Sequence, residues 1–292
     1  MNHQYFVSPE WLEAHLDDPL VRIIDATIFF DIDNEEMLKT GQAQYENHHI
    51  PGALEANLFD LSEPNAQLPF TVPAVEQLIT AFEGMGISDD THVVIYDSGP
   101  QVGVDFSAAI WAARLAWLML YAGLEKVSIL EGGFDLWLAE NRPLSKEIKT
   151  YPAGKLTCQA RFDYLVHKKD VRVAIDQEST LIIDALSVDQ FEGRIAPYGP
   201  ERAGHIPSSV NLFHGLFSDG KTGLVYDKER LLEIFNQAQG FDNAKKIIVY
   251  CGFGVSAAWL FVLLKHLGKD NIALYDGSLD EWTADPTCPL TF

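Results

Sequence analysis

Short runs of hydrophobic residues alternate along this chain with longer segments in which hydrophobic residues recur every three or four positions. The short runs are rich in Val and Ile and are bounded by turn-forming residues. Continuous β-branched runs of this kind predict strands that are covered on both faces of a sheet. The predicted strands include residues 23–24, 93–96 and 127–130 in the first half and 246–250 in the second.

The longer segments have the spacing of helices that bury one face. The first begins with Ser8 and Pro9, an N-cap residue followed by a residue suited to the first helical position, and the last is followed by Gly268. Strands that alternate with helices predict an α/β fold, with a mostly parallel sheet and helices on both of its faces. The predicted helices are residues 8–16, 74–85, 107–122, 163–169, 228–239 and 255–267.

The same pattern occurs twice along the chain, which predicts a tandem duplicated domain. The first domain is predicted at residues 1–140, the second at 161–292, and a polar linker rich in Pro and Gly at 141–160. Four short motifs recur in the same order, and the separation between paired motifs shrinks steadily, as loop-length changes would cause. The pairs are Val21-Arg-Ile-Ile-Asp-Ala with Leu181-Ile-Ile-Asp-Ala, His49-Ile-Pro-Gly with His205-Ile-Pro-Ser, Val93-Val-Ile-Tyr-Asp with Ile247-Ile-Val-Tyr-Cys, and Glu131-Gly-Gly-Phe-Asp-Leu-Trp with Asp276-Gly-Ser-Leu-Asp-Glu-Trp.

Acidic residues outnumber basic ones by 42 to 21 in the 292-residue chain, so the net charge is −21. This field repels phosphates and acidic lipids, so we expect neither nucleic acid nor a membrane as a partner. An anionic substrate needs a local basic cluster. The start of the chain lacks the basic and apolar regions of a signal peptide, and no apolar run reaches the ~20 residues of a membrane span. We therefore expect a cytoplasmic protein.

Three cysteines, Cys158, Cys251 and Cys288, are widely spaced and form no C-x-x-C motif. An odd number at such spacing argues against a disulfide framework and against a zinc site. We expect neither a metal nor a cofactor. Free cysteine most often packs as a small buried hydrophobe, so a reactive role has to be argued from the surroundings of each residue.

Cys251 has such surroundings. It directly follows a predicted strand, at the sheet edge where open α/β proteins bind ligands, and a predicted helix begins a few residues later. Two glycines allow a tight turn whose N–H groups, with the positive end of the helix dipole, face inward. We expect these groups to lower the pKa of the thiol and make Cys251 a nucleophile. The residues expected to stabilise it are Gly252, Phe253, Gly254, Val255 and Ser256.

These residues resemble the rhodanese family of sulfurtransferases in its two-domain form. The resemblance covers nearly the whole chain and includes His49-Ile-Pro-Gly, Gly204-His-Ile-Pro, the stretch 276–282 and the six-residue loop 251–256. It implies a silent first domain with Asp97 in the place of the cysteine. It also implies a persulfide on Cys251, formed from a small anionic sulfur donor and passed to cyanide, a thiol or a thioredoxin-like protein.

The donor is predicted to lie near two arginines. Arg194 and Arg202 flank a loop rich in Pro and Gly that resembles the donor-binding segment of mercaptopyruvate sulfurtransferases. That resemblance implies that both guanidinium groups bind the donor's carboxylate, for which their planar shape is suited. Asp60 resembles an aspartate of the same subgroup and is a weaker binding candidate. The alternative for both arginines is ordinary surface charge paired with a neighbouring Glu.

The identity of the donor stays open between 3-mercaptopyruvate and thiosulfate. The loop Cys251-Gly-Phe-Gly-Val-Ser is closer to the pattern of mercaptopyruvate users than to the Cys-Arg-Lys-Gly-Val pattern of thiosulfate users. However, Phe253 replaces the serine to which a proton-relay role is assigned in the first group. The stretch 64–69 also lacks the histidine of that group, so we expect the relay to be absent.

Two other functions compete with sulfur transfer. A cysteine phosphatase needs an arginine directly after the loop, and position 257 is Ala. A non-catalytic rhodanese-like module that senses sulfur or binds a partner would not need the thiol. His49 and His205 are predicted to be structural, and Trp137 and Trp282 are predicted to lie in the core.

Overall fold

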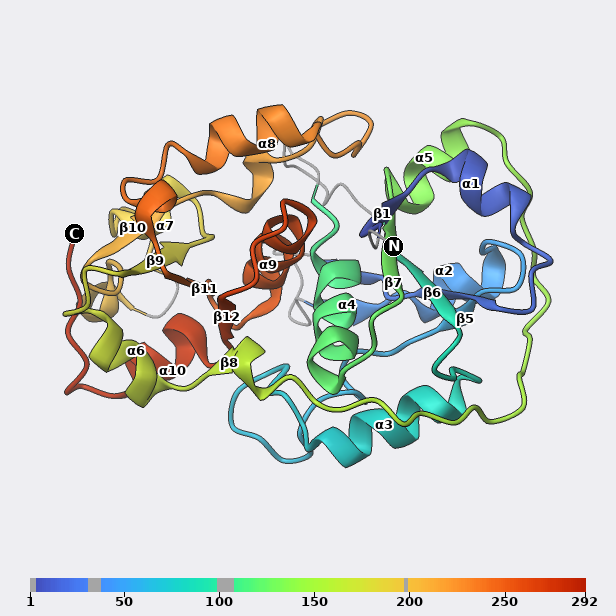
Figure 1. The fold of residues 1–292 in the computed structure, drawn as a ribbon, viewed down its shortest axis with the longest axis horizontal. Coiled ribbons are helices and arrows are strands. Elements are labelled where there is room, and N and C mark those ends of the chain that lie inside the picture. Colours follow the sequence, from blue (N-terminus) through green and yellow to red (C-terminus); the bar gives the residue numbers. More distant parts are fainter. Residues whose placement is uncertain (1–3, 31–37, 99–107, 197–198) are drawn as a thin grey trace. The chain divides into compact units, whose positions relative to one another are not determined.

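The computed structural model of the chain describes residues 4–30, 38–98, 108–196 and 199–292. The described residues form two compact units, each with its own sheet (Figure 1). The first unit comprises Met1–Pro64, Val72–Arg161 and Ser218–Val225, and the second comprises Asn65–Thr71, Phe162–Phe217 and Tyr226–Phe292. Each unit therefore includes one short segment that lies within the other repeat in sequence.

The two sheets have five parallel strands each and the same topology. The order in the first sheet is β1-β7-β6-β2-β5. Read from the corresponding edge, the order in the second sheet is β8-β12-β11-β9-β10. Asp25 lies opposite Tyr96 in the first sheet, and Asp184 lies opposite Tyr250 in the second, so the central strands share one register. This confirms the predicted fold class of tandem α/β domains. The strands are β1 Phe6–Val7, β2 Val21–Asp25, β5 Leu54–Glu55, β6 His92–Tyr96, β7 Val127–Leu130, β8 Leu165–Val166, β9 Thr180–Asp184, β10 Ser209–Asn211, β11 Lys246–Tyr250 and β12 Ile272–Tyr275.

Helices cover both faces of the first sheet. Side chains of α1, α2 and α5 share one core with Ile23, Val94 and Tyr96, which point to the same face of neighbouring strands. Helix α4 packs on β6 and β7, and all of its residues are buried, Arg114 included, as expected for a helix that is otherwise almost entirely apolar. A short antiparallel pair, β3 Ile28–Phe30 and β4 Leu38–Thr40, also belongs to this unit. The helices are α1 Pro9–Ala14, α2 Gln42–Asn47, α3 Val75–Gly84, α4 Ile110–Ala122 and α5 Gly133–Ala139.

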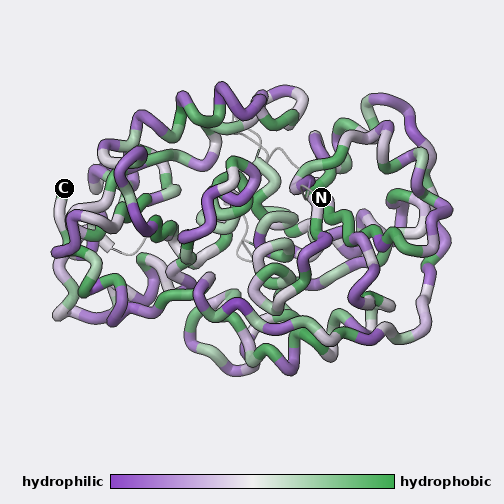
Figure 2. Tube along the Cα trace, in the orientation of Figure 1, coloured by the Kyte–Doolittle hydropathy of each residue, from purple (hydrophilic) through white to green (hydrophobic). Residues whose placement is uncertain are grey.

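The second unit has the corresponding arrangement. Helix α9 packs on β11 and β12, and it is largely buried, as α4 is. Helix α8 buries one face only, and Figure 2 shows hydrophilic and hydrophobic residues alternating along it. The helices are α6 Lys168–Ala174, α7 Val188–Phe191, α8 Lys228–Phe235, α9 Val255–His266 and α10 Ser278–Ala284, with single turns η1 Phe162–Tyr164, η2 Pro200–Arg202, η3 His214–Leu216 and η4 Phe241–Asn243.

One predicted helix is wrong. The pattern predicts a helix over residues 163–169, but the structure has a single turn η1, the edge strand β8 and only then the start of α6. The two residues of β8 pair with Leu274 and Tyr275 of β12, and so short a strand has no readable periodicity. The helix expected at 228–239 also ends earlier, at Phe235. The other predicted strands and helices are confirmed to within a few residues of their ends, except that residue 107, where one helix is predicted to begin, lies outside the described residues.

The segment predicted as the linker packs along the first unit. The guanidinium carbon of Arg22 lies 3.3 Å from the ring centroid of Tyr151, and the hydroxyl of Tyr151 donates to the carbonyl of Gly52 at 2.8 Å. The backbone N–H of Gly154 donates to the carbonyl of Glu83 at 2.7 Å. This part of the chain is therefore bound to the first unit by specific contacts.

The paired motifs have matching structural roles. Trp137 and Trp282 are fully buried, and each donates its indole N–H to a proline carbonyl six or seven residues later, at 2.8 Å in both units. The ring of His49 stacks on Tyr45 and that of His205 on Phe191, with centroids 4.1 Å and 3.5 Å apart. Nδ1–H of each imidazole donates to the carbonyl of its stacking partner. These contacts agree with the predicted core and structural roles.

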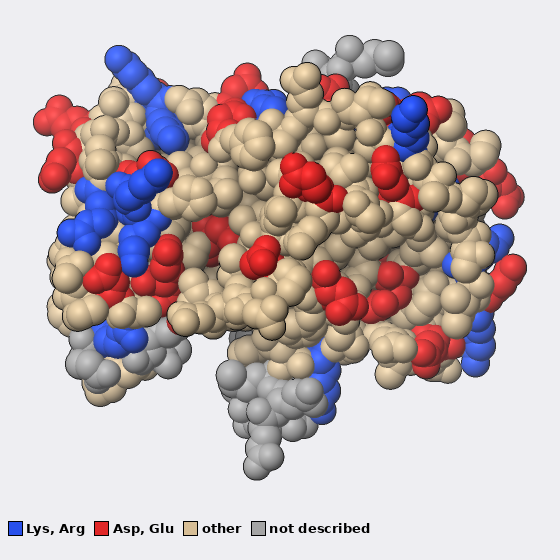
Figure 3. Space-filling view, turned by 90° about the horizontal axis from the view of Figure 1, so that it is seen from below, with Lys and Arg blue, Asp and Glu red and all other residues tan. Residues whose placement is uncertain are grey.

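The surface carries the excess of acidic residues. Figure 3 shows one face, over which acidic side chains are spread while some of the basic ones gather in one group. Among the described residues, no helix combines the length and the apolar character needed to cross a membrane.

Candidate active site

The loop that carries Cys251 joins β11 to α9. Cys251 is the first residue after β11, and its side chain is buried, with 2% of its surface exposed. Gly254 is the N-cap residue of α9 and has φ +79°, a left-handed conformation that a residue with a Cβ adopts only at a cost. The second glycine of the motif therefore allows the chain to turn directly from the strand into the helix.

Helix α10 holds the carbonyl side of this loop. Leu279 N–H donates to the carbonyl of Cys251 at 3.0 Å, and Asp280 N–H donates to that of Gly252 at 2.9 Å. The N–H of Cys251 donates to Ser278 Oγ at 3.1 Å, and Ser278 Oγ donates in turn to the carbonyl of Tyr275. These bonds occupy the carbonyl groups of Cys251 and Gly252 and hold the loop against the start of α10.

Three backbone N–H groups are directed at the Cys251 sulfur. They belong to Phe253 and Gly254 in the loop and to Ala257 in the first turn of α9. Phe253 and Gly254 are among the residues predicted for this role, whereas Ala257 is not. Of the other predicted loop residues, Val255 is buried and Ser256 is half-buried at the start of α9. The arrangement presents several donors to an anion on the sulfur.

The pKa of the Cys251 thiol is raised, and the predicted lowering is therefore wrong. Burial is the largest cause, because removal from water disfavours the thiolate, and the negative charge of Asp184 adds to it. The N–H groups of Ala257, Phe253 and Gly254 act in the opposite direction but do not outweigh the burial. The protonated thiol therefore predominates at neutral pH.

Asp184 is a buried carboxyl beside this loop that sequence reasoning did not assign to the site. It ends β9, and its Oδ1 accepts a hydrogen bond from the N–H of Leu186 at 2.8 Å. Burial raises the pKa of Asp184 to about 7, against the effect of Leu186 N–H and the Tyr250 hydroxyl. The repeated Ile-Ile-Asp-Ala motif was the signal that could have identified it.

His214 in η3 is a second buried group that sequence reasoning missed. Its Nδ1–H donates to the carbonyl of Ala185 at 2.8 Å, and the N–H of Ala185 donates to the carbonyl of Tyr250, the residue before Cys251. Burial lowers the pKa of His214 to about 4, so the ring is neutral at pH 7. The motif Asn211-Leu-Phe-His matches Asn57-Leu-Phe-Asp in the first repeat, and that match was the available signal.

The two predicted arginines have different surroundings. The side chain of Arg194 is 56% exposed and forms ion pairs with Asp189, at 2.6 Å, and with Glu192. Arg202 ends η2 and is half-buried, and its Nη2 is buried without a hydrogen-bond partner among the described residues. Burial raises the pKa of Asp280, and the charge of Arg202 opposes that rise. The charge of Arg202 thus acts on a residue whose own N–H binds the carbonyl of Gly252 in the Cys251 loop.

Comparisons with known proteins agree with this geometry. The model of the rhodanese-like domain matches residues 8–140 and 167–285. The chain belongs to the rhodanese family. It is 32% identical to the 3-mercaptopyruvate sulfurtransferase of Escherichia coli strain K12, over 99% of both chains. It is 29% identical to the mitochondrial thiosulfate/3-mercaptopyruvate sulfurtransferase 1 of Arabidopsis thaliana, over 97% of this chain and 77% of that one.

A solved structure gives the same result. The crystal structure of SseA from Escherichia coli, described with the rhodanese fold of 3-mercaptopyruvate sulfotransferases, matches with a TM-score of 0.79. The identity is 31%, and the match covers 94% of this chain and 98% of that one. The protein is thus a tandem rhodanese related to the 3-mercaptopyruvate sulfurtransferases.

In the first rhodanese-like repeat, Asp97 takes the place of Cys251. Its Oδ2 accepts hydrogen bonds from the N–H groups of Trp111 and Ala112 at the start of α4, both at 3.0 Å. Its backbone carbonyl accepts from Phe134 N–H at 2.9 Å, as that of Cys251 does from Leu279. Burial raises the pKa of Asp97 to about 7. Residues 99–107, which follow this position, lie outside the described part of the chain.

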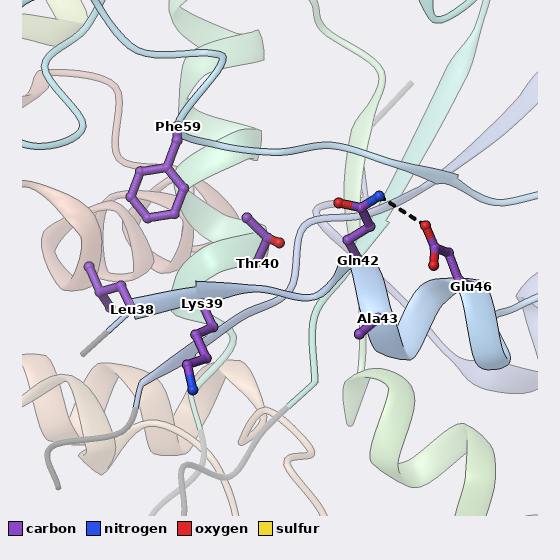
Figure 4. A pocket seen from close by; sticks show the side chains of 7 residues that line it. All are labelled: Leu38, Lys39, Thr40, Gln42, Ala43, Glu46 and Phe59. Atoms are coloured by element: carbon purple, nitrogen blue, oxygen red, sulfur yellow. Dashed lines mark hydrogen bonds between the residues drawn. The ribbon is translucent and has the colours of Figure 1, made fainter. Parts of the chain in front are cut away.

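Asp60, the weaker binding candidate, belongs to the first unit. Its Oδ2 accepts a hydrogen bond from Asn57 Nδ2 at 3.1 Å. Its neighbour Phe59 lines a hollow of about 750 Å³ above β4 and α2. Figure 4 shows the Phe59 ring on the same side as Leu38 and Thr40. Gln42 Nε2 donates a hydrogen bond to Glu46 Oε1 at 2.9 Å. None of the predicted site residues lines this hollow.

No metal site is found among the described residues, in the sense that no three His, Cys, Asp or Glu side chains come together to hold an ion. The second rhodanese repeat thus places one candidate nucleophile, Cys251, beside three backbone N–H donors. Asp184 and His214 lie on neighbouring segments, and the charge of Arg202 acts on Asp280.

Proposed function

We propose that this rhodanese is a sulfurtransferase that moves sulfane sulfur from 3-mercaptopyruvate or thiosulfate, through a persulfide on Cys251, to a thiophilic acceptor. Cyanide, a thiol or a thioredoxin-like protein would serve as the acceptor. The observation that carries the proposal is the convergence of the N–H groups of Phe253, Gly254 and Ala257 on the Cys251 sulfur. Such donors stabilise a negative charge that forms on sulfur during the reaction.

The reaction would proceed in two displacements. The Cys251 thiolate attacks the sulfur of 3-mercaptopyruvate, a sulfur–sulfur bond forms, and the carbon–sulfur bond breaks. Its electron pair leaves as the enolate of pyruvate, which takes up a proton. With thiosulfate, the outer sulfur is transferred and sulfite leaves. The acceptor then attacks the terminal sulfur of the persulfide and releases the Cys251 thiolate.

The raised pKa of the thiol bears on the first step. Cys251 must lose its proton before it attacks, and burial together with Asp184 opposes that loss. The three N–H donors favour every anionic form of the sulfur, including the persulfide, whose terminal atom also carries the negative charge. We therefore infer that proton loss accompanies binding of the donor, when the surroundings of the thiol change.

Arg202 is the better placed of the two arginines for holding the donor. Its buried Nη2 has no partner among the described residues, so a carboxylate or a thiosulfate oxygen would satisfy it. Arg194 is already paired with Asp189 and Glu192 and is open to water. A donor would have to compete with these two carboxylates, which makes Arg194 the weaker candidate.

A non-catalytic, partner-binding rhodanese module is the second candidate. The burial and raised pKa of Cys251 favour it, since buried structural cysteines are generally unreactive. The two functions differ in whether the thiol takes up sulfur.

Intact-mass measurement after incubation with each donor tests the proposal. The protein should gain one sulfur atom, Cys251→Ser should gain none, and the matched control Cys158→Ser should behave like the original chain. Later addition of cyanide should remove the sulfur. If no donor adds a sulfur atom that depends on Cys251, the sulfurtransferase proposal is wrong and the binding module is favoured.

A further inference from the structure

The middle of the Cys251 loop carries an aromatic ring. Phe253 directs its backbone N–H at the Cys251 sulfur, and its side chain is half-buried two residues after the thiol. The half-buried ring therefore adds an apolar surface in the middle of the loop. A small hydroxyl side chain at this position would instead offer a hydrogen bond.

The ring of Phe253 is stacked on that of Phe70. Their centroids are 5.8 Å apart and their planes are inclined by 29°, within the range of offset aromatic pairs. Phe70 lies in the segment Asn65–Thr71, which belongs to the first repeat in sequence but packs with the second unit. The pair thus joins the Cys251 loop to a distant part of the chain.

The backbone of Phe70 is strained. Its φ is +56°, a left-handed conformation that is unfavourable for a bulky residue with a Cβ, and its side chain is only 3% exposed. Such conformations persist where the surrounding structure holds them, and they are concentrated at functional sites. The strain therefore points to a requirement for the Phe70 ring at this place.

Charges near the loop set a second condition on the donor. Asp184 acts on the Cys251 sulfur, and Asp280 binds the carbonyl of Gly252 through its N–H. Arg202 is the basic residue whose charge acts on Asp280. A loop with two carboxyl groups and one guanidinium among its charged surroundings suits a monoanion better than a dianion, whose second charge would remain unpaired and partly desolvated.

We propose that Phe70 and Phe253, named here the aromatic pair, select organic monoanionic sulfur donors such as 3-mercaptopyruvate over thiosulfate. The inference rests on the proposed sulfur transfer. The half-buried ring of Phe253, held in place by the buried ring of Phe70, accommodates the methylene carbon of 3-mercaptopyruvate, whose carboxylate is bound by Arg202. Thiosulfate is a compact, strongly hydrated dianion without a carbon atom, so it loses hydration against the rings and gains no apolar contact.

Steady-state kcat/KM values for the two donors test this selection. In Phe253→Ser the ratio of thiosulfate to 3-mercaptopyruvate should rise by about tenfold, the size of discrimination that apolar contacts supply. Phe70→Gly removes the second ring and relieves the strained backbone, and it should shift the ratio the same way by about threefold, as the loss of one aromatic partner would. Because the rings act as a pair, the double variant should shift the ratio by less than the product of the single effects.

Phe162→Ser is the matched control, because Phe162 is 70% exposed in the same unit, and it should leave the ratio unchanged. Thermal unfolding of each variant shows whether it is folded, and Phe253→Leu and Phe70→Leu provide milder changes at the same positions. If the original chain takes up sulfur from neither donor, the proposed function itself fails. If the original chain takes up sulfur but the ratio of kcat/KM values stays constant in the Phe253 variants, the aromatic pair does not select the donor. The same conclusion holds if the ratio changes in the Phe253 variants but not in the Phe70 variants.

Discussion

The two repeats hold different side chains at the end of equivalent strands, Asp97 after β6 and Cys251 after β11. In both, the backbone carbonyl of this residue accepts a hydrogen bond from the first turn of the helix after the next strand. In both, the side chain faces N–H groups at the start of a long buried helix. The scaffold around the position is thus the same, and the chemistry of the side chain differs.

The difference lies in how each repeat satisfies its backbone donors. Asp97 accepts two hydrogen bonds with one carboxyl oxygen, so the N–H groups of Trp111 and Ala112 are occupied in the folded protein. The thiol of Cys251 is a weak acceptor until it loses its proton. The donors of the second repeat are therefore fully used only when charge develops on sulfur, which is the condition for transition-state stabilisation.

The backbone after the neighbouring strand shows a related difference. Gly133 in the first repeat has φ +55°, and a Cβ there would lie 2.5 Å from the carbonyl of Asp97. The second repeat has Ser278 at the corresponding point, with φ +49°. Its hydroxyl accepts the N–H of Cys251. In the second repeat a residue with a Cβ, Ser278, therefore occupies this left-handed conformation, and its hydroxyl binds the backbone of the residue that carries the thiol.

Giving the second repeat the side chain of the first at this position should have the largest effect on sulfur uptake. Cys251→Asp places a carboxyl among the same N–H donors, so the protein should stay folded but lose sulfur uptake completely. Intact mass with either donor and thermal unfolding measure the two properties. Sulfur uptake that survives this change would locate the nucleophile elsewhere, and Cys288→Asp provides a comparison at a cysteine outside the loop.

Removing the charge from the first repeat, with Asp97→Asn, should alter how stability depends on pH. The pKa of Asp97 is about 7 in the folded protein, and about 3.9 is usual for an unfolded aspartate. Its raised pKa therefore contributes stability that is complete below pH 4 and is lost as the pH rises to 7. The amide of the variant cannot ionise and does not lose this stability. The free energy of unfolding of the variant should therefore rise relative to that of the original chain by at most about 4 kcal/mol across this window.

Urea unfolding at pH values from 4 to 9 measures this relative gain. The gain should stop growing above pH 8, where Asp97 is ionised in both the folded and the unfolded chain. A difference in unfolding free energy that is constant from pH 4 to 7 would mean that Asp97 ionises normally in the folded protein. The two repeats would then differ less in their electrostatics than the structure indicates.

The sequence predicted the duplicated fold and the position of Cys251 because both depend on local patterns. Strand runs such as 127–130 and the Gly254 turn are encoded by a few neighbouring residues. The sign of the thiol's pKa shift could not be predicted in this way, because it depends on complete burial and on Asp184, which comes from another strand. Phe70 could not be found either, because its packing on Phe253 joins positions from the two repeats.

The arginine pair shows the same limit. The spacing of Arg194 and Arg202 along the chain predicts nearly the same role for both. In the structure Arg194 is paired with Asp189 and Glu192, whereas the Nη2 of Arg202 is buried and has no hydrogen-bond partner among the described residues.

Arg202→Ala should raise the KM for 3-mercaptopyruvate by about tenfold or more, as loss of a charged hydrogen bond does. Arg194→Ala should change it by less than about twofold, as expected for an exposed ion pair. Equal effects would mean that the donor displaces the partners of Arg194.

The smallest expected effect concerns Asp184, and it separates the two causes of the raised pKa of Cys251. The pKa of Asp184 is about 7, so its charge can act on the thiol only above that pH. In Asp184→Asn the pKa of Cys251 should fall, although burial should still hold it above the ordinary value for a thiol.

The rate of iodoacetamide alkylation at Cys251, followed by mass from pH 6 to 10, measures this shift in pKa. The two profiles should coincide below pH 7 and separate above it, with the variant reacting faster. Profiles that coincide throughout would mean that the charge of Asp184 does not act on the thiol. The contrast with Asp97 would then rest on the side chain alone and not on its charged neighbour.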